Sequence, residues 1–173
     1  MLGKPKQKRS QDRINKILQT AESILEHEST DALTIAKISE MAGLKRTSTY
    51  KFFETPDDIK LGLIQIYIKK CDQALIANLQ INSNAAYAAC LKDSVNIMIE
   101  FFRTNPGAQK LILENNVTPP VLSSELHTIA GSILRHVEGS IGLPNMFNKP
   151  GVFLVITQII FSILSLNTKK HGE

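Results

Sequence analysis

The sequence has few of the residues with which proteins bind metals or cross-link their chains. It contains two cysteines, Cys71 and Cys90, and neither has a histidine or another cysteine nearby in the sequence. Their spacing predicts no zinc site and no disulfide framework. A reducing cytoplasm is therefore the simplest location for the protein.

Long apolar segments are also missing. The N-terminus is basic and lacks the apolar core of a signal peptide. The most apolar run, Val152–Leu166, contains four polar residues and is shorter than the roughly twenty residues that a membrane-spanning helix needs. We therefore expect no membrane contact, and we interpret this run as a buried helix or a subunit interface.

Motifs for catalysis or cofactor binding are absent from the sequence. Glu114, Glu125 and Glu138 form no convergent pair, and there is no Ser-His-Asp arrangement, phosphate-binding glycine loop or dinucleotide fingerprint. His127 and His136 lie nine residues apart, which is no metal-ligand spacing, so both are expected at the surface. The sequence predicts neither an enzyme nor a cofactor or metal site.

Helical periodicity runs through the whole chain. No alternating segment is long enough for a strand, so the predicted fold class is all-α. One helix is expected from an N-cap at Ser10 to about Glu28, and a long connecting helix over about 56–81 follows the start signal Thr55–Asp58. Further helices are predicted over 85–103, over 108–115, from Thr118-Pro119-Pro120 to a loop at 142–151, and over 152–167.

Positive charge is concentrated at the start of the chain. The formal net charge is only +4, yet the first sixteen residues contain six cations and one acid, Asp12. A basic N-terminal arm over residues 1–13 is typical of chains that bind nucleic acid. A charged, frayed terminus is the plainer alternative.

Residues 34–53 have the pattern of a DNA-binding helix-turn-helix. Ile35, Ile38 and Ala42 share one helical stripe, and Gly43 can take the left-handed conformation that reverses the chain. Residues 45–51 then contain cations and hydroxyls but no acid, which suits a helix facing phosphates and base edges. We expect a three-helix head over residues 1–55 and a helical body over 56–173.

Several side chains of the head are candidates for DNA contact. Arg46 is the best candidate for reading a guanine and Thr47 for touching a thymine methyl, while the other residues suit phosphates. A solvated surface side chain is the alternative for each. The predicted set is Arg9, Arg13, Thr34, Lys45, Arg46, Thr47, Ser48, Tyr50 and Lys51.

The stretch from Ile17 to Leu63 resembles the tetracycline-repressor (TetR) family of bacterial transcription regulators. The shared features are an apolar first helix through Ala21, then Thr34, Ile38, Ala42-Gly43-Leu44, Ser48, Tyr50, Phe53 and a new helix directly afterwards. The resemblance implies a cytoplasmic, nucleoid-associated repressor that binds a near-palindromic operator in double-stranded DNA as a homodimer. It also implies a helical body with a small-molecule pocket and a dimer interface.

Three positions depart from the family pattern. Lys45 stands where a capping residue often begins the recognition helix, and Pro56 stands where many members have a lysine that contacts the DNA backbone. The chain also ends at Glu173, where a ninth helix would be expected to begin, so the C-terminus is either truncated or naturally short.

Two sites in the body follow from the resemblance. A pocket for a small apolar effector is predicted from Tyr87, Cys90, Met98, Phe101, Phe102, Phe147, Phe153 and Gln158. A dimer interface is predicted on the last helix from Phe153, Ile156, Ile160, Ile163 and Leu164. Aromatic residues at helical spacing more often form plain core. Two other functions stay open: a DNA-bound adaptor whose body binds a partner protein, and a helical enzyme or ligand carrier with an incidental helix-turn-helix.

Overall fold

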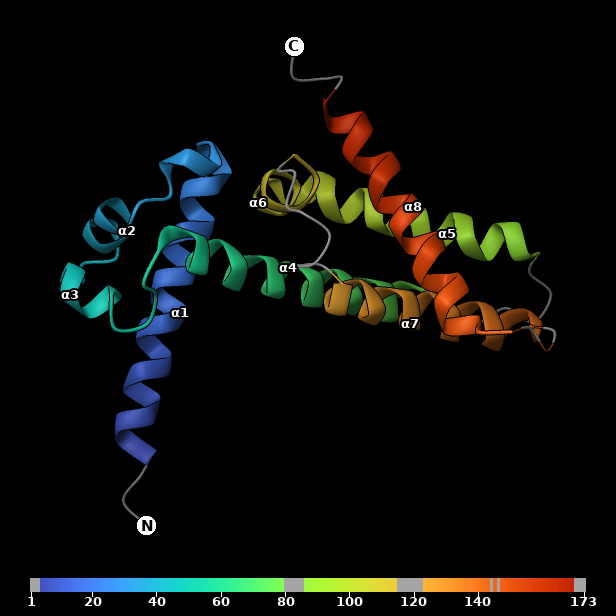
Figure 1. Ribbon diagram of the computed structural model, residues 1–173, viewed down its shortest axis with the longest axis horizontal. Helices are drawn as coiled ribbons and strands as arrows, with labels where there is room; N and C mark the ends of the chain where they lie inside the picture. Colours follow the sequence, from blue (N-terminus) through green and yellow to red (C-terminus); the bar gives the residue numbers. More distant parts are fainter. Residues whose placement is uncertain (1–3, 80–85, 115–122, 144, 146, 170–173) are drawn as a thin grey trace. The chain divides into compact units, whose positions relative to one another are not determined.

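The computed structural model describes residues 4–79, 86–114, 123–143, 145 and 147–169, which form eight α-helices and no strand (Figure 1). The all-α prediction is confirmed. The chain divides into two units, Met1–Ile64 and Gln65–Glu173, and the division lies within helix α4 (Pro56–Asn78). The sequence placed the domain boundary at the start of that helix.

The N-terminal unit contains α1 (Lys4–His27), a short 3-10 turn (Thr30–Ala32), α2 (Ile35–Met41), α3 (Arg46–Thr49) and the first turns of α4. Each of the three longer helices contributes fully buried side chains to one core. These include Ile17, Leu25, Ile38, Ile59 and Leu63. Burial of such aliphatic side chains is the main force that holds so small a unit together.

Helix α1 begins earlier than expected. Ser10 is not its N-cap, because the helix already starts at Lys4 and the described part of the basic arm is its first turns. Lysine, glutamine and arginine are good helix formers, and Pro5 lies in the first turn, where a missing N–H costs little. Residues 1–3 lie outside the described residues.

The predicted start of α4 is confirmed, and its geometry is a capping box. The backbone N–H of Asp58 donates to the Thr55 hydroxyl oxygen (3.2 Å), and the N–H of Thr55 donates back to the Asp58 carboxylate (2.8 Å). Hydrogen bonds from the backbone and then the hydroxyl of Thr55 hold the pKa of the Asp58 carboxyl below its ordinary value. The backbone N–H groups of Thr55 and Asp58 thus find their hydrogen-bond acceptors within the first turn of the helix.

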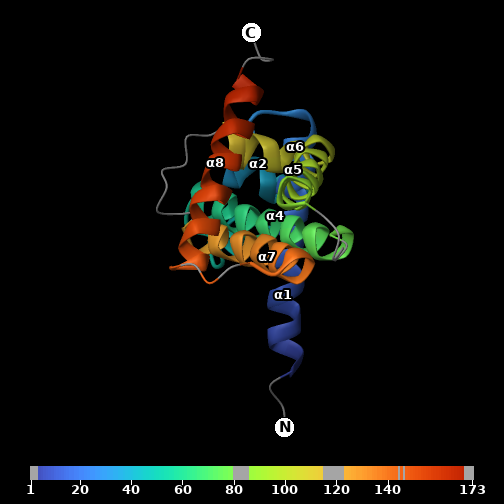
Figure 2. The same ribbon diagram turned by 90° about the vertical axis from the view of Figure 1, so that its right-hand side faces the viewer.

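The C-terminal unit contains the rest of α4, α5 (Tyr87–Thr104), α6 (Pro106–Ala108), a π-helical segment (Gln109–Glu114), α7 (Ser123–Ile141) and α8 (Lys149–Lys169). Helix α8 crosses α7 in both views and makes its largest interface with it (Figures 1 and 2). An edge-to-face pair of Phe102 with Phe161 packs α5 against α8, with ring centroids 5.8 Å apart, and Phe102 makes a second such pair with Phe101 within α5 (5.3 Å).

Two predicted helices of this unit differ from the structure. The expected α-helix over 108–115 is instead α6 followed by the π-helical segment, a form that occurs mostly as short, local insertions. The last helix begins at Lys149 and not at Val152, since the side chain of Asn148 accepts a hydrogen bond from the Gly151 N–H (3.2 Å) and caps it. The predicted helix start at Thr118-Pro119-Pro120 lies outside the described residues.

The length of α8 overturns one argument made from the sequence. The helix has 21 residues, and its stretch 149–168 is long and apolar enough to cross a membrane by length and composition. Core helices pass the same test, so this is weak support for a membrane span. One side of α8 packs inside the unit, where Phe153 and Thr157 are fully buried.

Hydrogen bonds between polar side chains join α4 to α7. The Ser132 hydroxyl donates to the Asp72 carboxylate, and Arg135 donates to the Ser132 oxygen (2.7 Å). One turn along α7, His136 is only 6% exposed, and neither ring nitrogen has a hydrogen-bond partner among the described residues. The expectation of a surface histidine was therefore wrong at position 136, because the buried face of α7 is wider than its aliphatic stripe, whereas His127 is exposed.

Cys71 and Cys90 are both buried, and neither forms a disulfide. Burial raises the pKa of the Cys71 thiol to about 12, and the neighbouring Asp72 carboxylate adds to the increase. The reactive thiolate of Cys71 is therefore scarce in the folded protein at neutral pH.

In a Cys90→Ala background, we expect iodoacetamide at pH 8 to modify Cys71 far more slowly in the folded protein than in denaturant. Because the folded thiol keeps a proton that the unfolded thiol loses above its ordinary pKa of 9.0, the free energy of unfolding should fall as pH rises from about 9 to about 12. Mass spectrometry measures the modification, and Cys71→Ala should flatten the fall. Equal rates of modification in both states would contradict the burial.

Candidate functional site

The turn between α2 and α3 has the geometry that the sequence predicts. Gly43 has a φ of 62°, in the left-handed region that favours glycine. Its N–H donates to the Glu40 carbonyl (3.0 Å), and the Leu44 N–H donates to the Ser39 carbonyl (2.8 Å). These two bonds form a Schellman motif, which ends α2 and sends the chain toward α3.

The start of α2 is also confirmed. The Thr34 hydroxyl oxygen accepts a hydrogen bond from the Lys37 N–H (3.2 Å), so Thr34 is the N-cap. The Lys37 ammonium in turn pairs with Glu28, just beyond the end of α1 (2.5 Å). Thr34 is exposed, and its hydroxyl proton stays available to an outside acceptor such as a phosphate oxygen.

A buried hydrogen bond joins α2 to α3. The hydroxyls of Ser39 and Thr49 lie 2.8 Å apart, and the two residues are 1% and 0% exposed. In so apolar a setting each hydroxyl depends on the other for its partner. This contact sets the rotation of α3 about its own axis, which decides the side chains that face outward.

Helix α3 is a single turn, and its outward face carries the predicted DNA contacts. Ser48 is half-buried, and Tyr50 is exposed to 52%. Lys45 precedes the helix without making a side-chain cap, as its departure from the family pattern suggested. The other exposed residues of the set on this segment are Lys45, Arg46, Thr47 and Lys51.

Arg13 brings α1 to the same surface. A groove of about 390 Å³ lies between α1 and the turn leading into α3, and its lining includes three cations and two hydroxyls. The lining residues are Arg13, Gly43, Leu44, Lys45, Thr47, Ser48 and Lys51. None of the three cations pairs with an acidic side chain of the described residues. Positive charge and hydroxyl donors in one concave surface suit a phosphate group.

Arg9 lies outside this groove. It is exposed on α1, four residues before Arg13 and on the same stripe of the helix. The structure thus brings Arg13 together with α3 and leaves Arg9 farther along α1. The sequence analysis did not predict the hydrogen bond between Ser39 and Thr49 that orients α3. Two hydroxyl residues on either side of a glycine turn could have indicated it.

The described cavities in the C-terminal unit separate the predicted pocket residues. A cavity of about 570 Å³ between α5, the π-helical segment and α8 includes Phe102, whereas Phe101 faces another of about 400 Å³ between α4 and α5. Cys90, Met98 and Phe153 are buried between helices, while Tyr87, Phe147 and Gln158 are exposed, Phe147 to 96%.

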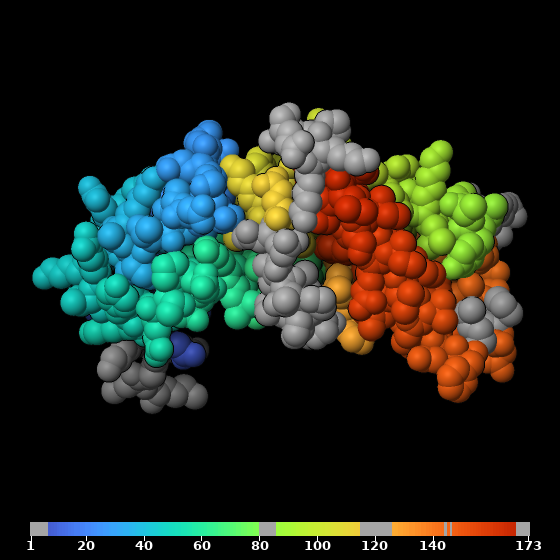
Figure 3. Space-filling view, turned by 45° about the horizontal axis from the view of Figure 1, so that its top comes forward, coloured from blue at the N-terminus to red at the C-terminus, as the bar shows by residue number. Residues whose placement is uncertain are grey.

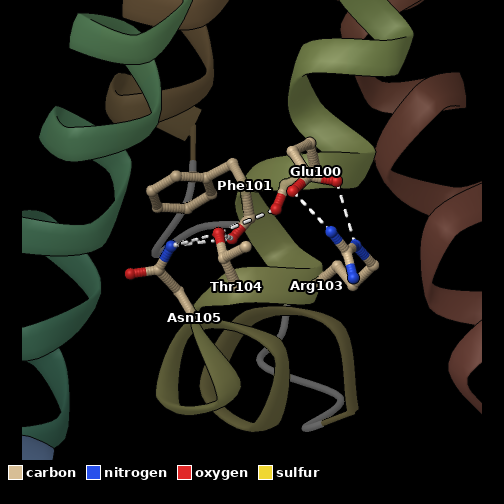
Figure 4. Close-up of polar contacts among 5 residues, drawn as sticks. All are labelled: Glu100, Phe101, Arg103, Thr104 and Asn105. Atoms are coloured by element: carbon tan, nitrogen blue, oxygen red, sulfur yellow. Dashed lines mark hydrogen bonds and ion pairs between the residues drawn. The ribbon is translucent and has the colours of Figure 1, made fainter.

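The larger cavity has an apolar floor and a polar rim. Its apolar lining consists of Ile99, Phe102, Leu113 and Leu164. Arg103 stands at the rim and donates two hydrogen bonds to Glu100 (2.9 and 2.7 Å), as Figure 4 shows. The remaining rim residues are Gln109, Glu114, Asn167 and Thr168. This size and lining fit a small amphipathic molecule.

The predicted dimer residues lie on two faces of α8. Phe153, Ile160 and Leu164 pack inside the unit, and Ile156 is half-buried, so of the predicted set only Ile163 is exposed. The large apolar residues that α8 leaves exposed are instead Val152, Val155, Ile159, Ile163 and Leu166. Their three- and four-residue spacing makes one outward stripe, and α8 lies at the surface in Figure 3.

No model of a known protein family matches the sequence, and no curated protein matches it. The fold is similar to a solved gamma-butyrolactone receptor described as ArpA-like, with a TM-score of 0.52 and 13% identity over 92% of this chain and 81% of that one. At this identity the likeness concerns the fold alone. Among the described residues, no three His, Cys, Asp or Glu side chains gather as metal ligands.

We expect Thr49→Val to lower the free energy of unfolding by about 1–3 kcal/mol, because it leaves the buried Ser39 hydroxyl without its partner. Ser39→Ala should cost a similar amount, and the double variant should cost less than the sum of the two. Urea unfolding of the four proteins measures this coupling. Strictly additive losses would contradict a hydrogen bond between the two side chains.

Proposed function

We propose that this protein is a TetR-type transcriptional regulator, a repressor that reads a near-palindromic operator in double-stranded DNA. The outward face of α3 carries the proposal, because Arg46 and Thr47 on this helix and Tyr50 directly after it are exposed, and a buried hydrogen bond holds the helix in position. The cationic groove that includes Arg13 lies directly beside it. Such a surface joins base-reading side chains to phosphate-binding ones.

The repressor acts as a homodimer through the outward stripe of α8. Val155, Ile159, Ile163 and Leu166 are each more than half exposed, which is costly for four large aliphatic side chains on one helix face. A two-fold axis would pair this stripe with its own copy. The two α3 helices would then enter major grooves about 34 to 36 Å apart.

A small amphipathic effector binds the C-terminal unit and changes the affinity for DNA. The cavity of about 570 Å³ supports this step, and Phe102 and Arg103 offer it a floor and a polar contact. Helix α4 begins in the N-terminal unit and ends in the C-terminal one, so it is the element through which the two sites are coupled. The protein works in the cytoplasm, at the nucleoid.

The purified protein should retain a small set of chromosomal fragments that share a palindrome. Sequencing of the retained DNA tests the function and the two-fold symmetry together. Recovery of fragments without a common sequence would contradict a sequence-specific regulator.

Arg46→Ala should weaken binding to the recovered operator by about 1–3 kcal/mol, and binding to random duplex by much less, because a base contact is lost. Lys45→Ala is the matched control, since a phosphate contact should weaken both duplexes alike. Fluorescence anisotropy at one salt concentration measures all four affinities. An equal effect of Arg46→Ala on both duplexes would exclude base reading by this residue.

Ile159→Glu should convert the dimer to a monomer and lower operator affinity, because it places a charge in the middle of the apolar stripe. Gln158→Glu adds the same charge on a neighbouring exposed position of α8 and should leave the dimer intact. Sedimentation at micromolar concentration measures the mass of each variant. A wild-type protein that sediments as a monomer would contradict this interface.

A further inference from the structure

The first turns of α1 stand apart from the core of the N-terminal unit. None of residues 7–16 is buried, and Ile17 is the first buried residue among the side chains of this helix that the structure describes. The part from Lys4 to Lys16 is about 20 Å long at 1.5 Å per residue. Figures 1 and 2 show these dark blue turns extending away from α2 and α3. Packing inside the unit therefore gives no reason for this length of helix.

Cations dominate this part of α1, and they are arranged on a stripe. Arg9, Arg13 and Lys16 follow one another at four and three residues, so they share one side of the helix, whereas Lys8 points elsewhere. Arg9, Arg13 and Lys16 are exposed, and none of them pairs with an acidic side chain of the described residues. Their charge is free to meet an external anion.

Arg13 makes this stripe continuous with the DNA-reading surface. It lines the groove that also contains Lys45 and Lys51 from either end of α3. Arg9 lies one helical turn farther out, about 6 Å along the axis. The basic surface therefore runs from α3 onto α1 and then away from the core.

A preformed helix differs from a loose basic tail in what it can bind. A tail must lose conformational freedom on binding, and its charges take no set spacing. Helix α1 carries its cations at a set spacing as a continuation of a packed helix, so it needs no separate nucleation. Such a rod can follow a row of phosphates, which are the principal anions beside a helix bound in the major groove.

We infer that the first turns of α1 act as a rigid basic rod that binds the backbone phosphates flanking the base pairs read by α3. The inference rests on the proposed DNA binding by α3. A rod of about 20 Å extends over about six base pairs at 3.4 Å each. Each half-site would then be protected beyond the bases that α3 touches.

The first experiment compares Arg9→Ala with Lys8→Ala, which removes an equal charge from the adjacent, equally exposed position. On a duplex carrying a recovered chromosomal fragment, Arg9→Ala should reduce the slope of log affinity against log salt by about 0.9. It should also remove hydroxyl-radical protection of the backbone sugars beside the outer phosphates. Lys8→Ala should change neither. Equal effects of the two variants would overturn the inference, because the positive charge of α1 would then attract DNA without a preferred side of the helix.

The second experiment keeps every charge and breaks the rod. Gln11→Pro interrupts α1 several residues before its first buried side chain, so the core should remain folded, as thermal unfolding would verify. We expect this variant to lose the outer protection, while Gln11→Ala keeps it. Full protection by Gln11→Pro would overturn the inference, because a loose tail would then suffice.

Two controls separate this inference from the proposed function. If the wild-type protein binds no duplex at all, both the proposed function and the inference about α1 are refuted. If it binds the operator and Arg9→Ala behaves like the wild type, only the rod is refuted. Binding to vesicles of anionic phospholipid that depends on Arg9, with unchanged affinity for DNA, would assign the rod to a membrane surface and also refute it.

Discussion

The hydrogen bond between the Ser39 and Thr49 hydroxyls is the contact on which the exposed surface of α3 depends. Helix α3 has only four residues, too few to be stable alone, so its orientation comes from α2 and from the turn at Gly43. Burying Thr49 turns Arg46 and Thr47 outward. Two uncharged residues beneath the surface therefore position the exposed cations. The same number of charges without this hydrogen bond would not have the same arrangement.

The sequence was sufficient for the N-terminal unit because its signals are local. A capping threonine at Thr34, a glycine at position 43 and the Thr55–Asp58 box each act within a few residues, and each is present as expected. The start of α1 was missed because Ser10 resembles a cap, although the residues before it favour a helix as well. When two local patterns predict different starts for one helix, the helix propensity of the whole segment decides between them.

The C-terminal unit was harder to predict because its features depend on contacts between distant segments. Apolar periodicity finds α8, but it does not tell the side that packs on α7 from the side left exposed, so inward-facing Phe153, Ile160 and Leu164 were assigned to a dimer interface. His136 was misplaced for the same reason. The cavity beside Phe102 depends on a π-helical segment for which the sequence gives no signal.

In the proposed complex with DNA, the shortness of α3 would limit how much of the DNA sequence one subunit can read. A single turn presents only two candidates for base reading, Arg46 and Thr47, which are enough to discriminate only a few base pairs. Each mismatched base pair costs only about 1–3 kcal/mol. A single half-site sequence therefore occurs too often in a genome to specify one location. Under the proposed function, selectivity would come from two weakly selective half-sites held at a fixed distance, so the spacing between the half-sites would matter as much as their bases.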